Sequence, residues 1–217
     1  ATRQRLDEEN AAGWSDPELR RWINEAVTDI ARKTEVLQTT AELDVDALDA
    51  EHTLPAGVLR VYRATYTEDG NDHIYPLEYM DFNAADSVWW TNMATTEARP
   101  RIFTLWGYPP TLKAVLYPVP SVAGTLTVYY YANPTPLATD GTDDAEELVA
   151  AEGYLDLILE YATSMALRRD RDPRWKEHKA KYDEDLNAMI EMTRRWSDQA
   201  GTISRQGYGL PDWLVNG

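Results

Sequence analysis

The apolar residues of this chain change their spacing twice along the sequence, and these two changes limit its folds more than any other feature. Leu19, Ile23 and Ala26 lie three or four residues apart, the spacing of one face of an α-helix. Between residues 58 and 131 runs of alternating residues have the period of half-buried β-strands. Beyond Pro136 the helical spacing returns. The sequence therefore predicts helices on both sides of a β-rich segment.

The first helix has a clear start signal. Ser15 stands three residues before Glu18, which is the spacing of a capping box, and Pro17 lies in the first turn. The helical spacing continues to about Gln38. We therefore expect an amphipathic helix that begins after Ser15 and ends near Gln38.

Residues 40–52 form an acidic stretch in which apolar and acidic side chains alternate. This alternation fits either a strand or an irregular connector. A calcium loop would need a glycine and a terminal glutamate that the stretch from Glu42 to Asp49 lacks. A solvated segment without a metal is therefore the favoured interpretation.

The central segment carries several strand signals separated by turn residues. A first strand from Val58 to Tyr66 is followed by the turn residues 68–71. The other expected strands are residues 74–77, 101–106, 112–117 and 125–131. These signals predict a small antiparallel β module of about five strands over residues 53–132.

Two further helices are expected after the β module. Asp143 or Asp144 can cap the first, and Pro173 opens the second, which ends before Gly201. The link between them is short, so they should pair as an antiparallel hairpin. Their expected buried residues are Leu155, Ile158, Leu159, Ala162, Leu186, Met189 and Ile190.

The predicted fold class is α+β, with a helical bundle and an inserted small antiparallel β module. The bundle comprises residues 1–52 and 133–200, as an N-terminal helix plus the C-terminal hairpin. Residues 53–132 form the β module. Residues 201–217 form an extended C-terminal tail, because they contain Gly207, Gly209 and Pro211 and show no period.

Composition excludes several classes of function. The 217-residue chain has no cysteine, so it has neither disulfides nor thiolate metal sites. Its formal charge of −16 would repel polyanions and favours a protein partner over nucleic acid. No apolar run approaches the roughly 20 residues that cross a bilayer, and residues 1–7 lack the apolar segment of a signal peptide. We expect a soluble protein that has no membrane contact and is not secreted by that route.

No motif indicates catalysis. His52, His73 and His178 lie far apart and match no ligand or triad spacing. The glycines stand singly, so there is no phosphate-binding loop. Carboxylate pairs are plentiful, but nothing selects one as a glycosidase dyad. We therefore expect no catalytic, metal or cofactor-binding residues, no cofactor, and a protein that is not an enzyme.

The aromatic residues are unusual because 8 Trp and 13 Tyr stand against 2 Phe. Trp and Tyr are enriched in protein interfaces. Trp89, Trp90, Trp106 and Tyr108 belong to the β module's own core or to its contact with a neighbouring subunit, or else to a platform that stacks on sugars. The second alternative would make the chain an aromatic-rich carbohydrate-binding or tail-associated module.

An arginine cluster lies between the two C-terminal helices. Arg168, Arg169 and Arg171 alternate with Asp170 and Asp172. A helix C-terminus and a solvated turn explain this pattern better than a nucleic-acid site does. We hypothesise that these three arginines, with Trp89 and Trp90, contact a neighbouring subunit.

Four segments together carry a resemblance to a known family. They are residues 14–26 (Trp14 to Ala26), 114–120, 126–134 and 161–167, within a span of about residues 14–197. In these segments, and in the order of its elements, the chain resembles the head-to-tail adaptor, or connector, proteins of tailed phages.

The resemblance implies a structural role in the virion neck, where portal protein meets the stopper or tail protein. Family members form an oligomeric ring, usually a dodecamer, that docks on the portal after DNA packaging. DNA would only pass through the channel. The chain would reside in the host cytoplasm during assembly and in the virion afterwards.

The expected tail carries an apolar density that a permanently solvated segment does not need. It contains Tyr208, Leu210, Trp213 and Leu214. These side chains either fold back on the bundle or dock in pockets of the portal. Portal docking is the preferred hypothesis, because the resemblance implies a C-terminus that binds the portal.

Overall fold

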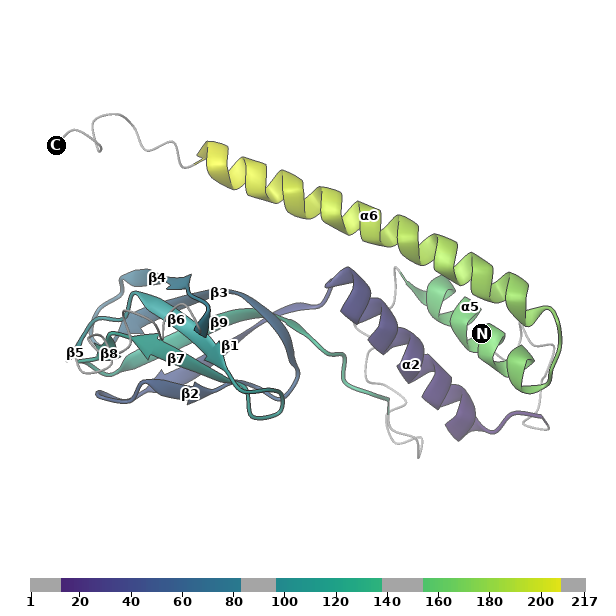
Figure 1. The fold of residues 1–217 in the computed structure, drawn as a ribbon, viewed down its shortest axis with the longest axis horizontal. Coiled ribbons are helices and arrows are strands. Elements are labelled where there is room, and N and C mark those ends of the chain that lie inside the picture. Colours follow the sequence, from purple (N-terminus) through teal and green to yellow (C-terminus); the bar gives the residue numbers. More distant parts are fainter. Residues whose placement is uncertain (1–12, 83–96, 138–153, 208–217) are drawn as a thin grey trace. The chain divides into compact units, whose positions relative to one another are not determined.

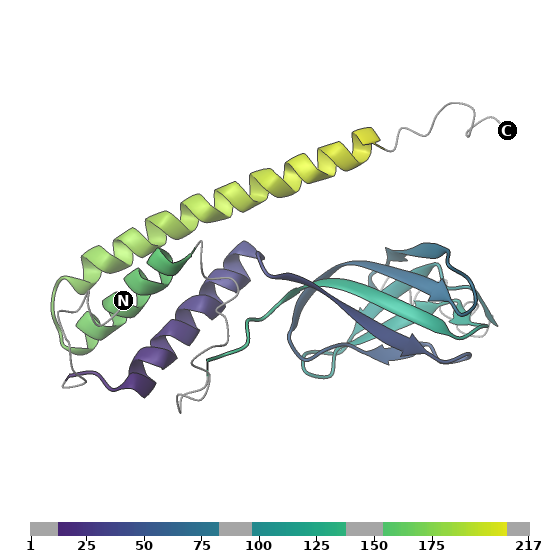
Figure 2. The ribbon, with the colours of Figure 1, turned by 180° about the vertical axis from the view of Figure 1, so that it is seen from behind.

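The computed structural model of the chain describes residues 13–82, 97–137 and 154–207, with side chains described as far as residue 195. The chain divides into two compact units. One unit consists of Ala1–Val36 and Thr135–Gly217 and is helical; the other, Leu37–Pro134, is built of strands (Figures 1 and 2).

The described part of the helical unit contains α2 (Asp16–Thr34), α5 (Leu155–Arg169) and α6 (Trp175–Gly207). The predicted capping box at the start of α2 is confirmed. The Glu18 carboxylate accepts hydrogen bonds from the backbone N–H of Ser15 at 3.1 Å and from its hydroxyl at 2.8 Å. The helix ends a turn earlier than expected, because Glu35 adopts the left-handed conformation with φ 51°.

The three helices pack through two apolar clusters, which both contact Ile23. Residues spaced three and four apart on α2 face α5 and α6, which run antiparallel to each other (Figure 2). The buried members of the two clusters are Trp14, Leu19, Trp22, Ala26, Val27, Ile30, Leu157, Ile158, Ala162, Ala166, Tyr182, Leu186 and Met189.

Three expectations for the C-terminal helices need correction or fall outside the structure. α6 does not end before Gly201 but continues to Gly207, so the predicted extended tail is partly helical. Leu155 was expected in the buried stripe but is 46% exposed at the first turn of α5. The predicted caps Asp143 and Asp144 lie outside the described residues.

The β unit is larger than the predicted module. Its described strands are β1 (Gln38–Val45), β2 (Glu51–Thr53), β3 (Val58–Glu68), β4 (Ile74–Tyr79), β5 (Glu97–Ala98), β6 (Ile102–Trp106), β7 (Lys113–Tyr117), β8 (Val119–Pro120) and β9 (Gly124–Ala132). Seven of them form one sheet in the order β1-β9-β3-β4-β6-β7-β2, in which only β4 and β6 are parallel. β5 and β8 form a separate parallel pair.

This sheet curls on itself. β1 and β2 lie at opposite edges, yet only residues 46–50 connect them along the chain. The backbone N–H of Leu48 donates to the Pro120 carbonyl at 2.8 Å, which ties this connection to the far side of the sheet. Residues from both sides, including Val45 of β1 and Leu116 of β7, share one buried core. The sheet is therefore nearly closed, like a barrel.

The predicted fold class, a helical bundle with a small antiparallel β module, is wrong. The acidic stretch does not join the bundle: Gln38–Val45 is an edge strand, and Glu51–Thr53 is the edge strand on the other side. In β1 the apolar residues Leu43 and Val45 face the core, while Glu42 and Asp44 face outward. The alternation was visible, but a connector fitted it equally well, and a parallel β4–β6 pair has no local signal.

Candidate protein-interaction surfaces

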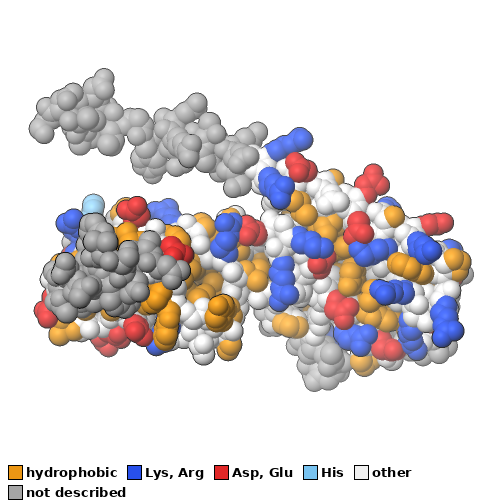
Figure 3. All heavy atoms as spheres, in the orientation of Figure 1, with side chains coloured by type: hydrophobic (Ala, Val, Ile, Leu, Met, Phe, Trp, Pro, Cys, Tyr) orange, Lys and Arg blue, Asp and Glu red, His pale blue; other side chains and the backbone are white. Residues whose placement is uncertain are grey.

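Charged side chains of both signs are mixed over the helical unit on the face drawn in Figure 3, where basic and acidic groups alternate with apolar ones. That face therefore presents no broad field of one sign. Recognition of a partner there would depend on local groups of side chains rather than on long-range attraction.

The predicted arginine cluster is largely engaged within the chain. The Arg169 guanidinium lies 2.9 Å from the Glu18 carboxylate of α2, and Arg168 lies over the Trp175 ring at 5.5 Å. Hydrogen bonds from Ser15, followed by the charge and hydrogen bond of Arg169, lower the pKa of Glu18. Arg171 is exposed at the left-handed position of the turn, with φ 59°. These contacts fix the α5–α6 turn against the start of α2.

The tip of the β6–β7 hairpin exposes two adjacent aromatic side chains. Trp106 is 49% exposed and Tyr108 is 85% exposed. The backbone N–H and hydroxyl of Thr111 donate to the Tyr108 carbonyl at 2.8 and 3.1 Å, which closes the tip. Gly107 has φ 91°, and a side chain there would meet the Thr111 carbonyl at 3.0 Å. The tip is thus a preformed turn that holds its aromatic groups outward.

A second exposed group lies on the outer face of β3 and β9, and we call it the arginine–tyrosine cluster. Its members are Arg60, Tyr62, Arg63, Tyr129 and Tyr131. The Tyr62 ring lies 4.9 Å from that of Tyr131 and 6.4 Å from that of Tyr129. Arg60 covers the Tyr131 ring at 5.0 Å, and Arg63 covers the Tyr129 ring at 5.1 Å. Such cation–π contacts hold both guanidinium groups in place.

Strand register explains why these residues meet. In β9 the side chains of Leu126, Val128 and Tyr130 point into the core, so Tyr129 and Tyr131 point outward. β3 pairs with β9 in an antiparallel register that shifts between Val58 and Arg60 and again between Val61 and Arg63, so Tyr62 lies within the second irregularity. These irregularities turn Tyr62 outward between the two β9 tyrosines.

Sequence reasoning missed the arginine–tyrosine cluster. The spacing of Tyr129 and Tyr131 showed that they share one face, and Arg60 and Tyr62 have the same spacing. Only the pairing of β3 with β9, which are more than 50 residues apart in the chain, brings the two sets together. No local signal fixes that pairing.

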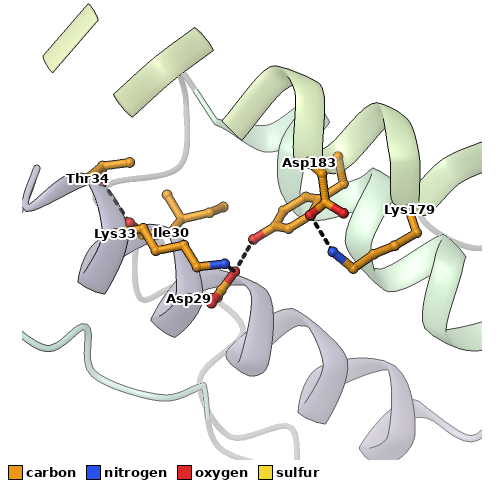
Figure 4. A network of polar contacts seen from close by, with 7 residues as sticks. Asp29, Ile30, Lys33, Thr34, Lys179 and Asp183 are labelled. Atoms are coloured by element: carbon orange, nitrogen blue, oxygen red, sulfur yellow. Dashed lines mark hydrogen bonds and ion pairs between the residues drawn. The ribbon is translucent and has the colours of Figure 1, made fainter. Parts of the chain in front are cut away.

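A polar network joins the helices α2 and α6 (Figure 4). The Tyr182 hydroxyl donates to Oδ2 of Asp29 at 2.7 Å, and the Lys33 ammonium lies 2.8 Å from the same oxygen. Burial, followed by the hydrogen bond to Asp29 and its charge, raises the pKa of Tyr182. Lys179 and Asp183 form an ion pair beside it on α6. The network is structural, because its proton donors and acceptors are already paired with one another.

Several predicted site residues cannot be placed. Trp89, Trp90, Tyr208, Leu210, Trp213 and Leu214 all lie outside the described residues. Among the residues that are described, no group of three or more potential ligands could hold a metal ion. No helix in the described ranges is both long and apolar enough to cross a bilayer.

Comparison with known proteins gives one family. A family model described as SU10 adaptor protein matches residues 1–206. A search of curated proteins found no match.

Proposed function

The chain belongs to the SU10 adaptor protein family, and on this basis we propose that it is a head-to-tail adaptor of a tailed phage. In this proposal, copies of the chain form a ring between the portal protein and the stopper or tail protein. The observation that carries the proposal is the extent of the family match, which covers both units of the chain. The role is structural and requires no catalytic group.

The division into two units supports a role between two different partners. The helical core and the sheet core share no buried residue. Each unit therefore holds its own surface in shape, and each can meet a different neighbour. An adaptor needs this property, since its head side and its tail side contact different proteins.

The length of α6 supports docking through the C-terminal segment. Among the α6 side chains that the structure describes, which extend to residue 195, Ile190 is the last that packs on the helical core, yet the helix continues to Gly207. This extension is about 25 Å long at 1.5 Å per residue. Met192 on it is 47% exposed. Tyr208, Leu210, Trp213 and Leu214, which follow this helix in the sequence, remain our proposed anchors for the portal.

The contacts between neighbouring subunits are also part of the proposal. Trp89, Trp90, Arg168, Arg169 and Arg171 are the residues first proposed for them. The Arg169–Glu18 ion pair adds a constraint, because a neighbour that binds Arg169 would have to share or displace Glu18. Among these residues Arg171 is favoured most clearly for a subunit contact, because it is exposed.

A carbohydrate-binding module is the second candidate. The observation in its favour is the exposed pair Trp106 and Tyr108 at the β6–β7 tip, because aromatic faces can stack on sugar rings. The same pair suits a protein contact, since Trp and Tyr supply large area at a low entropic cost. Family membership favours the protein contact.

Mass measurement of the purified chain with and without portal protein tests the proposal. We expect the chain to join the portal as a ring of copies, and removal of residues 208–217 to abolish attachment without lowering the melting temperature. The truncated chain ends at Gly207 and so keeps the whole of α6, which makes it a matched variant of the full chain. Failure of the full chain to bind portal, together with retention on glycan beads, would support the carbohydrate-binding alternative instead.

A further inference from the structure

The arginine–tyrosine cluster is chemically distinct from the rest of this acidic chain. Arg60, Tyr62 and Arg63 are all exposed on β3 although the chain carries a formal charge of −16. Arginine and tyrosine are the residue types most often found at the energetic centres of protein interfaces. A partner of the arginine–tyrosine cluster must offer a surface that complements its charge and its aromatic rings.

The other flank of β9 carries the opposite charge. β1 pairs with β9 on the side away from β3, with Glu42 opposite Thr127 and Asp44 opposite Thr125. Leu43 and Val45 of β1 point to the core, so Glu42 and Asp44 share the outer face with the cluster. Both carboxylates are exposed, and neither is ion-paired within the described part of the chain. We call these two residues the acidic flank.

Within the described part of the chain, only β9 pairs with the segment of β3 that carries the cluster. β4 pairs with β3 only from Ala64 to Thr67, whereas the residues from Val58 to Arg63 pair with β9 alone in the described structure. One sheet face therefore has a basic aromatic flank on β3 and an acidic flank on β1, with β9 between them. On this face the two flanks lie about 10 Å apart across the strands, because neighbouring strands lie about 4.8 Å apart.

We propose that the arginine–tyrosine cluster of one copy binds the acidic flank of a second copy. This contact uses two different patches of the same chain, so a copy can offer its cluster to one neighbour and its acidic flank to another. Repeated contacts of that kind build a closed ring when the rotation between copies closes. The inference rests on the proposed function in that a ring of copies is its expected outcome, and it names the surfaces that meet.

The geometry of the cluster favours a carboxylate partner. The Arg63 guanidinium lies over the Tyr129 ring, and the N–H groups at the edge of a guanidinium can donate two parallel hydrogen bonds to a carboxylate. The neighbouring Tyr62 ring is 43% exposed and adds apolar area next to the charge. Acidic residues on the other faces of one copy would repel the acidic flank of the next copy. The charge pattern therefore also selects one orientation.

Nucleic acid is the competing occupant, because arginine and tyrosine also bind phosphates and stack on bases. The acidic flank lies on the same sheet face and would repel a phosphate backbone. The structure therefore favours a second copy over DNA.

Because the chain has no cysteine, single engineered cysteines report contacts between copies without interference. We would mix Tyr62→Cys copies with Glu42→Cys copies under mild oxidation and measure the linked pair on a non-reducing gel. The matched control mixes Tyr62→Cys with Glu184→Cys, which places the second thiol at an exposed position on α6. The mixture of Tyr62→Cys and Glu42→Cys should give mostly the mixed pair, and the control should not. Equal yields in both mixtures would overturn the proposal.

Charge reversal supplies the second arm. Adding Arg63→Glu to the Tyr62→Cys copy should lower the yield of the mixed pair about tenfold, because it places like charges together. Adding Asp44→Arg to the Glu42→Cys copy should then restore the yield. An Arg63→Glu copy that links as well as its parent would contradict the proposal, as would single-stranded DNA that binds the parent through Arg63 and blocks linking.

Portal attachment is measured separately, so the two ideas can fail separately. If the copies link as expected but do not bind portal, the proposed neck function fails and the contact stands. If the chain forms a ring on portal but the linking is independent of Arg63, the ring uses other surfaces and this inference fails.

Discussion

The Tyr182 hydroxyl donates a 2.7 Å hydrogen bond to the Asp29 carboxylate and so joins α6 to α2 across the helical unit (Figure 4). Tyr182 is fully buried, and its ring also meets that of Tyr161 at 5.1 Å in an edge-to-face arrangement. The contact thus combines a charge-assisted hydrogen bond with aromatic packing between three helices.

Tyr182→Phe should weaken the helical unit. The substitution keeps the ring but leaves the Asp29 carboxylate without its buried donor, which should lower the free energy of unfolding by about 1 to 3 kcal/mol. Urea denaturation measures the change. Asp183→Asn is the control, since it removes only a partly exposed ion pair and should change stability by less than about 1 kcal/mol. Equal stability of Tyr182→Phe and its parent would show that the hydrogen bond is absent.

The buried carboxylate of Glu160 predicts a specific dependence on pH. Its side chain is 4% exposed and receives hydrogen bonds from His178 at 2.7 Å and Lys181 at 2.8 Å. Burial acts to raise the pKa of Glu160, but these two hydrogen bonds and the charges of their donors outweigh it and lower the pKa below 4.5. The ionised Glu160 carboxylate therefore stabilises the fold at neutral pH. This stabilisation is lost as the pH falls below 4.5 and through the folded-state pKa of Glu160.

Glu160→Gln should consequently be less stable than the parent at neutral pH, by about 1 to 3 kcal/mol. The difference should shrink as the pH is lowered into the acid range, because the parent loses its advantage there. Denaturation curves over a pH series measure this convergence. A difference that stays constant with pH would contradict the pKa argument, and Glu184→Gln, at an exposed position on α6, provides the control.

Two leucines on neighbouring helices test the packing of the helical unit. Leu186 is 3% exposed in the core, whereas Leu155 is 46% exposed. Leu186→Ala should lower the free energy of unfolding by about 2 to 5 kcal/mol, because it removes buried apolar atoms and leaves a cavity. Leu155→Ala should cost less than about 1 kcal/mol. A reversed order of the two melting temperatures would refute the assigned core.

Gly124 tests the packing of the sheet. A Cβ atom at this position would lie 2.2 Å from the Thr67 carbonyl oxygen and 2.9 Å from the Tyr66 ring. Neither neighbour can move easily, because Thr67 pairs with the adjacent strand and the Tyr66 hydroxyl bonds the Val122 carbonyl at 2.5 Å. Gly124→Ala should therefore destabilise the β unit by more than about 2 kcal/mol.

Gly57→Ala is the matched control for that change. Its Cβ would meet nothing nearer than the Asn133 carbonyl at 3.9 Å, so the melting temperature should stay the same or rise slightly. Both variants are compared by thermal melting. If the two variants had the same melting temperature, the close packing of β9 against β3 at Gly124 would be contradicted.

The sequence predicted elements best where the signal was local. The Ser15–Glu18 capping box marked the start of α2, and Leu19 and Ala26 were correctly placed on its buried face. Both depend on residues within a few positions of each other. Boundaries were weaker: Gly201 does not end α6, because a single glycine costs a helix only about 1 kcal/mol.

What the sequence could not supply was pairing between distant strands. Nothing near β1 indicates that it pairs with β9, and nothing near β4 indicates a parallel partner in β6. The size of the sheet and the arginine–tyrosine cluster both depend on such pairings, so both were missed. The family, in contrast, was reached from residue patterns spread over most of the chain, and the match to residues 1–206 confirms it.

Cryo-electron microscopy of a virion neck that contains this chain tests the central claim most directly. The account predicts a closed ring of copies between portal and tail, in which Arg63 of each copy lies against Asp44 of its neighbour. A neck in which the copies form no closed ring between portal and tail, or a ring in which Arg63 lies away from Asp44 of the neighbouring copy, would contradict the account.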